Sequence, residues 1–168
     1  LPVSVVNQLT VTVAGASLDA GDLSTIDGRT GVKVTTSEAT TITGTASEVV
    51  TALASSGLDL NASDVDVTLD NAETATVTQI NSMVSTTGSG SVLTAVVSTS
   101  AVHMGDDAAN NLMDLTSDNA DNLTITIGSL GATAAQLNSI ITKTSATVDA
   151  TAVTEITATY DELRGDGS

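Results

Sequence analysis

The chain has 168 residues and contains no cysteine, no phenylalanine and no tryptophan, with a single tyrosine and a single proline. The absence of cysteine excludes a disulfide framework and any thiol chemistry. The absence of large rings leaves only aliphatic side chains and threonine methyl groups for a core, although 40% of the residues are hydrophobic. A small unit with so thin a core would hardly offset its conformational entropy, roughly 1–2 kcal/mol per ordered residue, so we expect burial between neighbouring units.

Basic residues are also scarce. Four Lys and Arg residues stand against 20 Asp and Glu, which gives a formal net charge of −16. Nucleic acid is excluded as a partner, because binding to phosphates needs a basic stripe that displaces counterions. Such an acidic surface attracts cations and tolerates salt, which favours divalent ions or a saline exterior.

Long apolar runs are missing as well. No stretch approaches the ~20 apolar residues that a transmembrane helix needs, so we predict no membrane span. The chain opens on Leu1 without Met and without a charged leader segment. We expect it to be an excised or processed piece of something longer.

What the chain does contain is an internal repeat. Residues 1–54 can be laid over 115–168 without a gap, a shift of 114, and a weaker copy lies halfway at a shift of 57. The pattern predicts three units in one continuous array. They are residues 1–57, 58–114 and a truncated third unit, 115–168. The matches that support the shift of 114 are 9–13 with 123–127, Leu23 and Ile26 with Leu137 and Ile140, and Thr45 and Glu48 with Thr159 and Glu162.

Each unit reads as strands and short helices in alternation. Alternating β-branched residues predict strands at 10–13, 32–34, 40–43 and 65–69. Apolar spacing predicts a helix with Leu23 and Ile26 on one face and another over 46–54, with Gly57 as its left-handed cap.

Four helix starts have the form of a capping box, in which a Thr oxygen and an acidic or amide side chain three residues later satisfy each other's backbone amides. They recur in phase with the repeat, since Thr76 lies 57 residues before Thr133 and Thr45 lies 114 before Thr159. We therefore predict helices beginning after each of these four threonines.

Short strands that alternate with short helices favour a parallel sheet, because parallel neighbours need a crossover connection. We expect an α/β repeat solenoid of three units of about 57 residues. The alternative is a mixed β-solenoid in which the short helices are only corners.

Enzymatic chemistry has little support in the sequence. His103 is the only histidine, so neither a histidine zinc cluster nor a pair of imidazole acid–base groups can form. Carboxylates are numerous, but the aromatic platforms on which sugar rings stack are missing. We predict a protein that is not an enzyme, and a polysaccharide-acting solenoid enzyme is the last-ranked alternative.

The acidic turns are candidate calcium sites. At the 57-residue shift Asn61 and Asp64 fall on Asp118 and Asp121, in the turn that enters each unit's first strand. Calcium prefers several hard oxygens from carboxylates, amides and carbonyls in a loop. Asn and Asp also form Asx-turns without any ion, and both interpretations stay open. Residues close enough in sequence to add ligands are Asp59, Asp66, Asp114 and Asn119.

Several segments resemble the giant tandem-repeat surface proteins of marine cyanobacteria and other bacteria. They are the Asp-Leu-Ser-Thr-Ile-Asp-Gly segment at 22–28, the Thr-Ile-Thr-Gly-Thr-Ala-Ser-Glu-Val segment at 41–49, and the related residues 148–150 and 154–157. The resemblance implies an extracellular role in a cell-surface layer, in adhesion or in a motility-related coat, often with calcium, and it supplies no catalytic residues.

Three functions follow in order of preference. The first is a structural or adhesive surface module, the second a calcium-binding module that stabilises an extracellular repeat array, and the third the enzyme described above. The expected partners are neighbouring repeats or copies of the chain end to end, and cell-surface polysaccharide is a further candidate.

Overall fold

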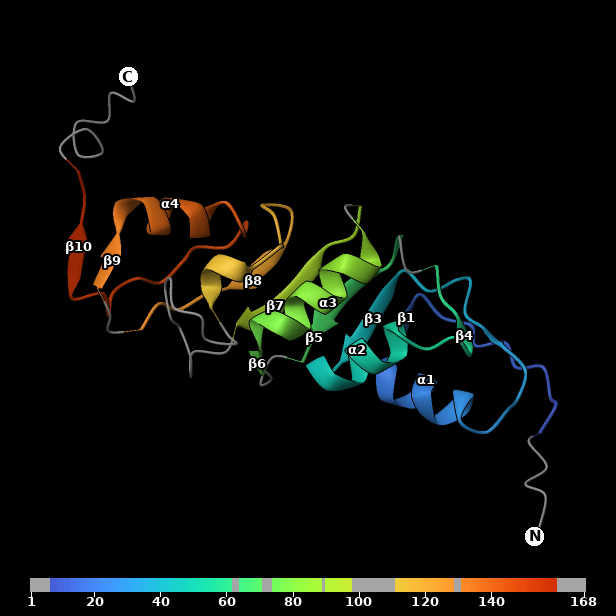
Figure 1. The fold of residues 1–168 in the computed structure, drawn as a ribbon. Helices are drawn as coiled ribbons and strands as arrows, with labels where there is room; N and C mark the ends of the chain where they lie inside the picture. Colours follow the sequence, from blue (N-terminus) through green and yellow to red (C-terminus); the bar gives the residue numbers. More distant parts are fainter. Residues whose placement is uncertain are drawn as a thin grey trace, which may run out of the picture. The chain divides into compact units, whose positions relative to one another are not determined.

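The computed structural model describes residues 7–61, 64–70, 74–88, 90–97, 111–128 and 131–159. In these residues the chain is a mixed α/β protein with four α-helices and short strands that pair in parallel (Figure 1). The predicted α/β class is confirmed. Backbone contacts divide the chain into unit 1, Leu1–Glu73 with Ser82–Leu93, and unit 2, Thr74–Asn81 with Thr94–Ser168. This division does not address the predicted 57-residue period, which stays a prediction.

Unit 1 contains two parallel ladders and two helices. The first ladder has the order β1, β3, β5, with β3 in the middle, and the second joins β2 to β4. Helix α1 follows β1 directly, and α2 follows β3 after one residue. The elements are β1 (Ser17–Asp19), α1 (Ala20–Asp27), β2 (Val34–Thr35), β3 (Thr41–Gly44), α2 (Ala46–Leu53), β4 (Leu58–Asp59) and β5 (Asp66–Leu69).

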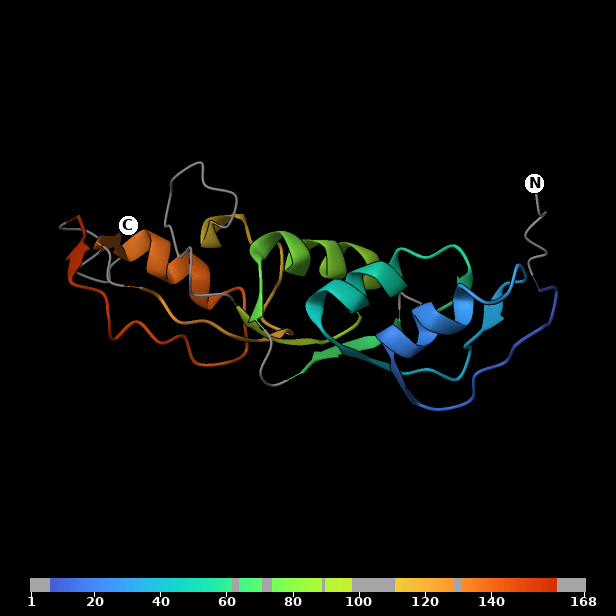
Figure 2. The ribbon, with the colours of Figure 1, turned by 90° about the horizontal axis from the view of Figure 1, so that it is seen from below.

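The core of unit 1 lies between the first ladder and the two helices. Leu18, Ile42 and Val67 are neighbours across the three strands and are all buried. Figure 2 shows α1 and α2 side by side over the strands, and α2 contributes the buried Val49 to the interface. Because alternate strand residues point to opposite faces, the polar neighbours of these three residues face away from the helices.

Unit 2 is built from the same kinds of element. Strand β7 pairs with β6 and β8, and β9 pairs with β10, in parallel throughout. Helix α3 begins in unit 2 and ends among residues assigned to unit 1. The elements are β6 (Thr74–Ala75), α3 (Val77–Thr87), β7 (Leu93–Val97), the 3-10 helix η3 (Leu112–Asp114), β8 (Asn122–Thr124), β9 (Gly131–Thr133), α4 (Ala134–Ile141) and β10 (Glu155–Thr157).

Three of the four predicted capping boxes are confirmed. Thr45 and Glu48 begin α2, and Thr133 and Gln136 begin α4, each with both reciprocal bonds. At the start of α3, the Thr76 amide donates to Gln79 Oε1 and the Gln79 amide donates to Thr76 Oγ1. The fourth box, at Thr159, extends beyond the described residues.

Two local predictions need correction. Gly57 was predicted as a left-handed cap, but among the described residues positive φ occurs only at Gly15, Gly44 and Gly88. The cap of α2 is Ala54 in the right-handed region. The predicted strand at 10–13 is reduced to one isolated bridge, Thr12 with Thr35.

The same hydrogen bonds recur at a separation of 114 residues. Thr30 Oγ1 donates to the carbonyls of Asn7 and Leu9, and Thr144 Oγ1 donates to those of Asp121 and Leu123. The remaining matches follow the same shift. They are the bridges Thr12–Thr35 and Thr126–Asp149, the pairs β1–β3 and β9–β10, and helices α1 and α4. Residues 7–44 and 121–158 therefore follow one local hydrogen-bonding plan.

The pairing register has a nearly constant step. Ser17 pairs with Thr41 and Thr41 with Asp66, 24 and 25 residues apart. The pairs β2–β4 and β9–β10 are also offset by 24 residues. The pairs β6–β7 and β7–β8 differ, with offsets of 22 and 28.

Candidate functional site

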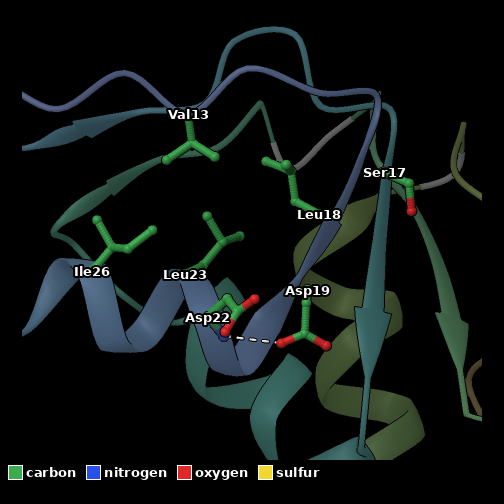
Figure 3. A pocket seen from close by; sticks show the side chains of 7 residues that line it. All are labelled: Val13, Ser17, Leu18, Asp19, Asp22, Leu23 and Ile26. Carbon is green, nitrogen blue, oxygen red and sulfur yellow. Dashed lines mark hydrogen bonds between the residues drawn. The ribbon is translucent and has the colours of Figure 1, made fainter.

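The main cavity of unit 1 lies beside β1, on the edge away from β3. It has a volume of about 350 Å³ and is lined by Val13, Ser17, Leu18, Asp19, Asp22, Leu23 and Ile26. Figure 3 shows four aliphatic side chains from three segments around one space: Val13 before β1, Leu18 in β1, and Leu23 and Ile26 in α1. The sequence places them there because Leu23 and Ile26 lie three apart on one helix face.

The two carboxylates at the rim of this cavity belong to the start of α1. Asp19 is the N-cap, and its Oδ1 accepts a hydrogen bond from the Asp22 amide at 2.9 Å. A carboxylate at a helix N-terminus is stabilised by the exposed amides and by the helix dipole. Asp19 therefore has a structural role, and the cavity offers an apolar wall rather than a reactive group.

A second hollow lies in unit 2, where β9 and β10 meet the start of α4. It has a volume of about 280 Å³ and is lined by Thr133, Ala135, Thr157, Ala158 and Thr159. Thr133 is the N-cap of α4, with its hydroxyl bonded to the Gln136 amide. The lining consists of hydroxyl and methyl groups, which suit contact with a surface more than catalysis.

The structure brings Asn61 and Asp64 together, as the calcium prediction requires of these two residues. Asn61 Nδ2 donates to Asp64 Oδ2 at 2.6 Å, and the Asp64 amide donates to the Asn61 carbonyl. The carboxylate thus meets the amide nitrogen, whereas a bound calcium ion would require the amide oxygen. As described, the pair closes a turn.

Asp118 and Asp121 form the equivalent turn in unit 2. The Asp121 amide donates to the Asp118 carbonyl, and the Asp118 amide donates to Asp121 Oδ2 at 3.3 Å. Asp118 Oδ1 also accepts from the Ala120 amide, an Asx-turn. Asp121 is buried and its carbonyl accepts from Ser145, so this turn is held by the segment after α4.

The neighbouring acidic residues have other partners. Asp59 forms an ion pair with Lys33 at 3.0 Å, both side chains more than half exposed, and Asp66 Oδ1 accepts from the Val92 amide. Asp114 and Asn119 are exposed. In the part of the chain that the structure describes, no three His, Cys, Asp or Glu residues are grouped so that they could hold a metal ion. The calcium prediction stays a prediction.

One carboxylate has a perturbed acidity. The Thr151 amide and hydroxyl both donate to Asp149 Oδ1, at 2.9 and 2.7 Å. These hydrogen bonds, the backbone one first, hold the pKa of Asp149 below its usual value because they stabilise the charged form. Asp149 also forms the bridge with Thr126, so its carboxylate fixes the turn that follows the bridge.

His103, the single histidine, lies outside the described residues. Among the described helices, none has both the length and the apolar character needed to cross a bilayer. No family model, curated protein or solved structure matches this chain.

Sequence reasoning missed the cavity beside β1. Leu23 and Ile26 were recognised as one apolar helix face, but the pattern cannot tell whether such a face is covered. The available signal was the alignment of Leu9 with Leu123, because the second copy has further chain before it that can cover the equivalent residues.

Proposed function

We propose that this chain is a non-enzymatic structural and adhesive module of a large extracellular surface protein, folded as an α/β repeat solenoid. The register carries the proposal: residues 24 or 25 apart align in parallel from β1 to β3, from β3 to β5 and from β9 to β10. A chain that returns to the same position at a fixed step gains length with each step, and each step buries the apolar face of the one before.

Threonine hydroxyls support this role by closing each step without aromatic or disulfide support. Thr36 Oγ1 donates to the Asp59 carbonyl and Thr30 Oγ1 to the Leu9 carbonyl, bonds that join residues 23 and 21 apart. Both hydroxyls belong to buried residues. Buried backbone groups need partners, so these side chains hold consecutive steps in register where the ladders are only two residues long.

The surface charge supports the extracellular assignment. A net charge of −16 keeps neighbouring arrays apart and soluble, and salt weakens their repulsion. Lys33 pairs with Asp59 at the surface, while most carboxylates cap turns and helices. A module of this kind provides spacing and a hydrated acidic exterior, with no substrate to convert.

Removal of one whole step tests the proposal. We expect deletion of residues 41–65 to leave a folded chain, because Asp66 then takes the position that Thr41 holds beside Ser17. In a nearest-neighbour array the lost step lowers stability without abolishing the fold. Far-UV circular dichroism and thermal unfolding of the deleted chain measure the outcome.

The matched control is a shorter deletion, residues 41–52, which removes half a step and puts β5 out of phase with β1. The array predicts that this smaller deletion does more damage than the larger one. Loss of cooperative unfolding in both variants, or greater damage from the longer deletion, would show that the register step is not a building unit.

Calcium-dependent stiffening is the second candidate. It is favoured by the recurrence of one turn, in which the amide of residue i+3 donates to the carbonyl of residue i, at Asn61–Asp64 and at Asp118–Asp121. Ions bound at such turns would stabilise the array by mass action.

A further inference from the structure

Equivalent residues at the two ends of the 114-residue correspondence differ sharply in burial. Leu9 is 62% exposed, whereas Leu123 is 0% exposed. The local hydrogen bonds are the same, since each carbonyl accepts from the hydroxyl of Thr30 or Thr144. The difference comes from a neighbouring strand: β8 pairs with β7, which places Ala95 beside Leu123. Among the described residues no strand takes that place beside Leu9.

The cavity beside β1 reports the same missing neighbour. Val13, Leu18 and Ile26 line it, and their equivalents Ile127, Ala132 and Ile140 are all buried. In unit 2 the 3-10 helix η3, with the buried Leu112, packs against α4, the equivalent of α1. The fold therefore contains a filled version of the same apolar surface, covered by a preceding segment.

The opposite end has the reverse defect. Ile156 in β10 is 59% exposed, whereas its equivalent Ile42 in β3 is 0% exposed. Ile42 lies between Leu18 and Val67 because β3 has a strand on each side. In the described part of the chain β10 pairs only with β9, through Ala132 beside Ile156. Its second edge and one large apolar side chain remain uncovered.

We infer that a second copy of this chain occupies the β1 end, with its β10 paired in parallel to β1 and its Ile156 beside Leu18 at the mouth of the cavity. The inference rests on the proposed array function and names its partner. The step from β1 to β3 and from β3 to β5 is the template: Leu18, Ile42 and Val67 already form such a row inside the chain. Docking continues the row from one molecule to the next.

The geometry of the contact determines the assembly. The surface at β1 and the surface at β10 are different, so the interface is heterologous and repeats head to tail. Each added copy presents a new β10 edge, which produces open chains of molecules. Because each copy carries a net charge of −16, repulsion opposes docking and salt strengthens it.

Sedimentation velocity of the full chain between low and high salt tests the inference. We expect concentration-dependent oligomers that grow with salt. Ile156→Asp should lower the association constant at least about tenfold, because it removes a buried aliphatic contact and places a charge in the interface. Val92→Asp is the matched control, since Val92 is also exposed but lies away from both docking edges, and it should associate as the unmodified chain does.

A mixing experiment separates head-to-tail docking from other association. Leu9→Asp blocks the β1 end and Ile156→Asp the β10 end, so each variant alone should be monomeric. Mixed in equal amounts, they should form dimers and stop there. A monomeric unmodified chain at high salt and high concentration, or a mixture that stays monomeric, overturns the docking proposal. The step-deletion experiment uses single molecules, so its outcome separates this failure from failure of the array.

Discussion

Thr144 shows how one hydroxyl can hold two segments of this aliphatic protein together. Its Oγ1 donates to the Leu123 carbonyl at 2.8 Å and accepts from the amides of Leu123, at 2.8 Å, and Ala146, at 3.0 Å. Thr144 and Leu123 are both buried, so water cannot easily replace these bonds. Thr30 makes the equivalent bonds to Leu9 and Val32, but beside an exposed Leu9.

This difference in exposure gives a prediction for two identical substitutions. Thr144→Val keeps the shape of the side chain but leaves buried backbone groups without partners, which costs about 1–3 kcal/mol. For a chain of this length each kcal/mol lowers Tm by roughly 2–4 °C. Thr30→Val should cost clearly less, because solvent reaches the groups around Leu9. Thermal unfolding followed by circular dichroism measures both.

Equal losses in the two variants would show that exposure at Leu9 does not matter, and a larger loss in Thr30→Val would contradict the hydrogen-bond argument. Thr142→Val serves as a further control because Thr142 is exposed and its hydroxyl bonds only to the nearby Ser139 carbonyl. It should change Tm little.

Gly57 shows what a residue pattern cannot reveal. The sequence predicted this glycine as a left-handed cap, a local property that Gly after a helix often has. Its actual constraint is long range, since a Cβ at Gly57 would clash with the Asp27 carboxylate. Asp27 in turn accepts from the Ser55 hydroxyl at 2.7 Å. A contact between residues 30 apart in sequence leaves no signal in local spacing.

At the scale of whole elements, helix starts were the most predictable feature. A capping box depends on four consecutive residues and needs no knowledge of the rest of the fold. The boxes at Thr45, Thr76 and Thr133 were therefore found from the sequence alone. Strand ends were less predictable: the predicted strand at 10–13 kept only the bridge at Thr12, because a strand exists only where a partner lies beside it.

The box at α2 gives the element-scale prediction. Thr45→Ala removes the acceptor for the Glu48 amide and the hydroxyl that donates to Glu48 Oε2 at 2.8 Å. The expected cost is about 1 kcal/mol, within a range of about 0.5–2. Helix α2 has eight residues and buries Val49 and Leu53, so the loss should lower the Tm of the whole chain and not only fray the helix.

Ser47→Ala tests whether the cap itself is responsible. Ser47 is exposed in the first turn of α2, and the alanine should be neutral or slightly stabilising since it favours helix. Thermal unfolding of both variants decides the question. A drop in Tm for Ser47→Ala as large as that for Thr45→Ala would assign the effect to the helix turn instead of the capping box.

At the scale of the whole molecule, the predictable property was the composition and the unpredictable one was the covering of the ends. Few basic residues and no aromatic platform pointed away from nucleic acid and from catalysis before any fold was known. The repeat pointed to equivalent positions such as Leu9 and Leu123. Only the structure shows that one is exposed and the other buried, because burial depends on which segments lie alongside.

The net charge and the acidic turns together give the last prediction, a comparison of Tm in EDTA, in calcium and in magnesium at equal ionic strength. Screening of the charge of −16 should raise Tm by the same amount with either ion. Calcium sites at Asn61–Asp64 and Asp118–Asp121 predict an additional rise with calcium alone, about 2.7 kcal/mol of stabilisation per site at 100 times Kd. Asp64→Asn and Asp118→Asn should then each remove part of that excess while keeping the turn, since Asn also forms Asx-turns. Equal Tm values with the two ions would leave these four residues as turn formers, and the array would owe its stability to stacking alone.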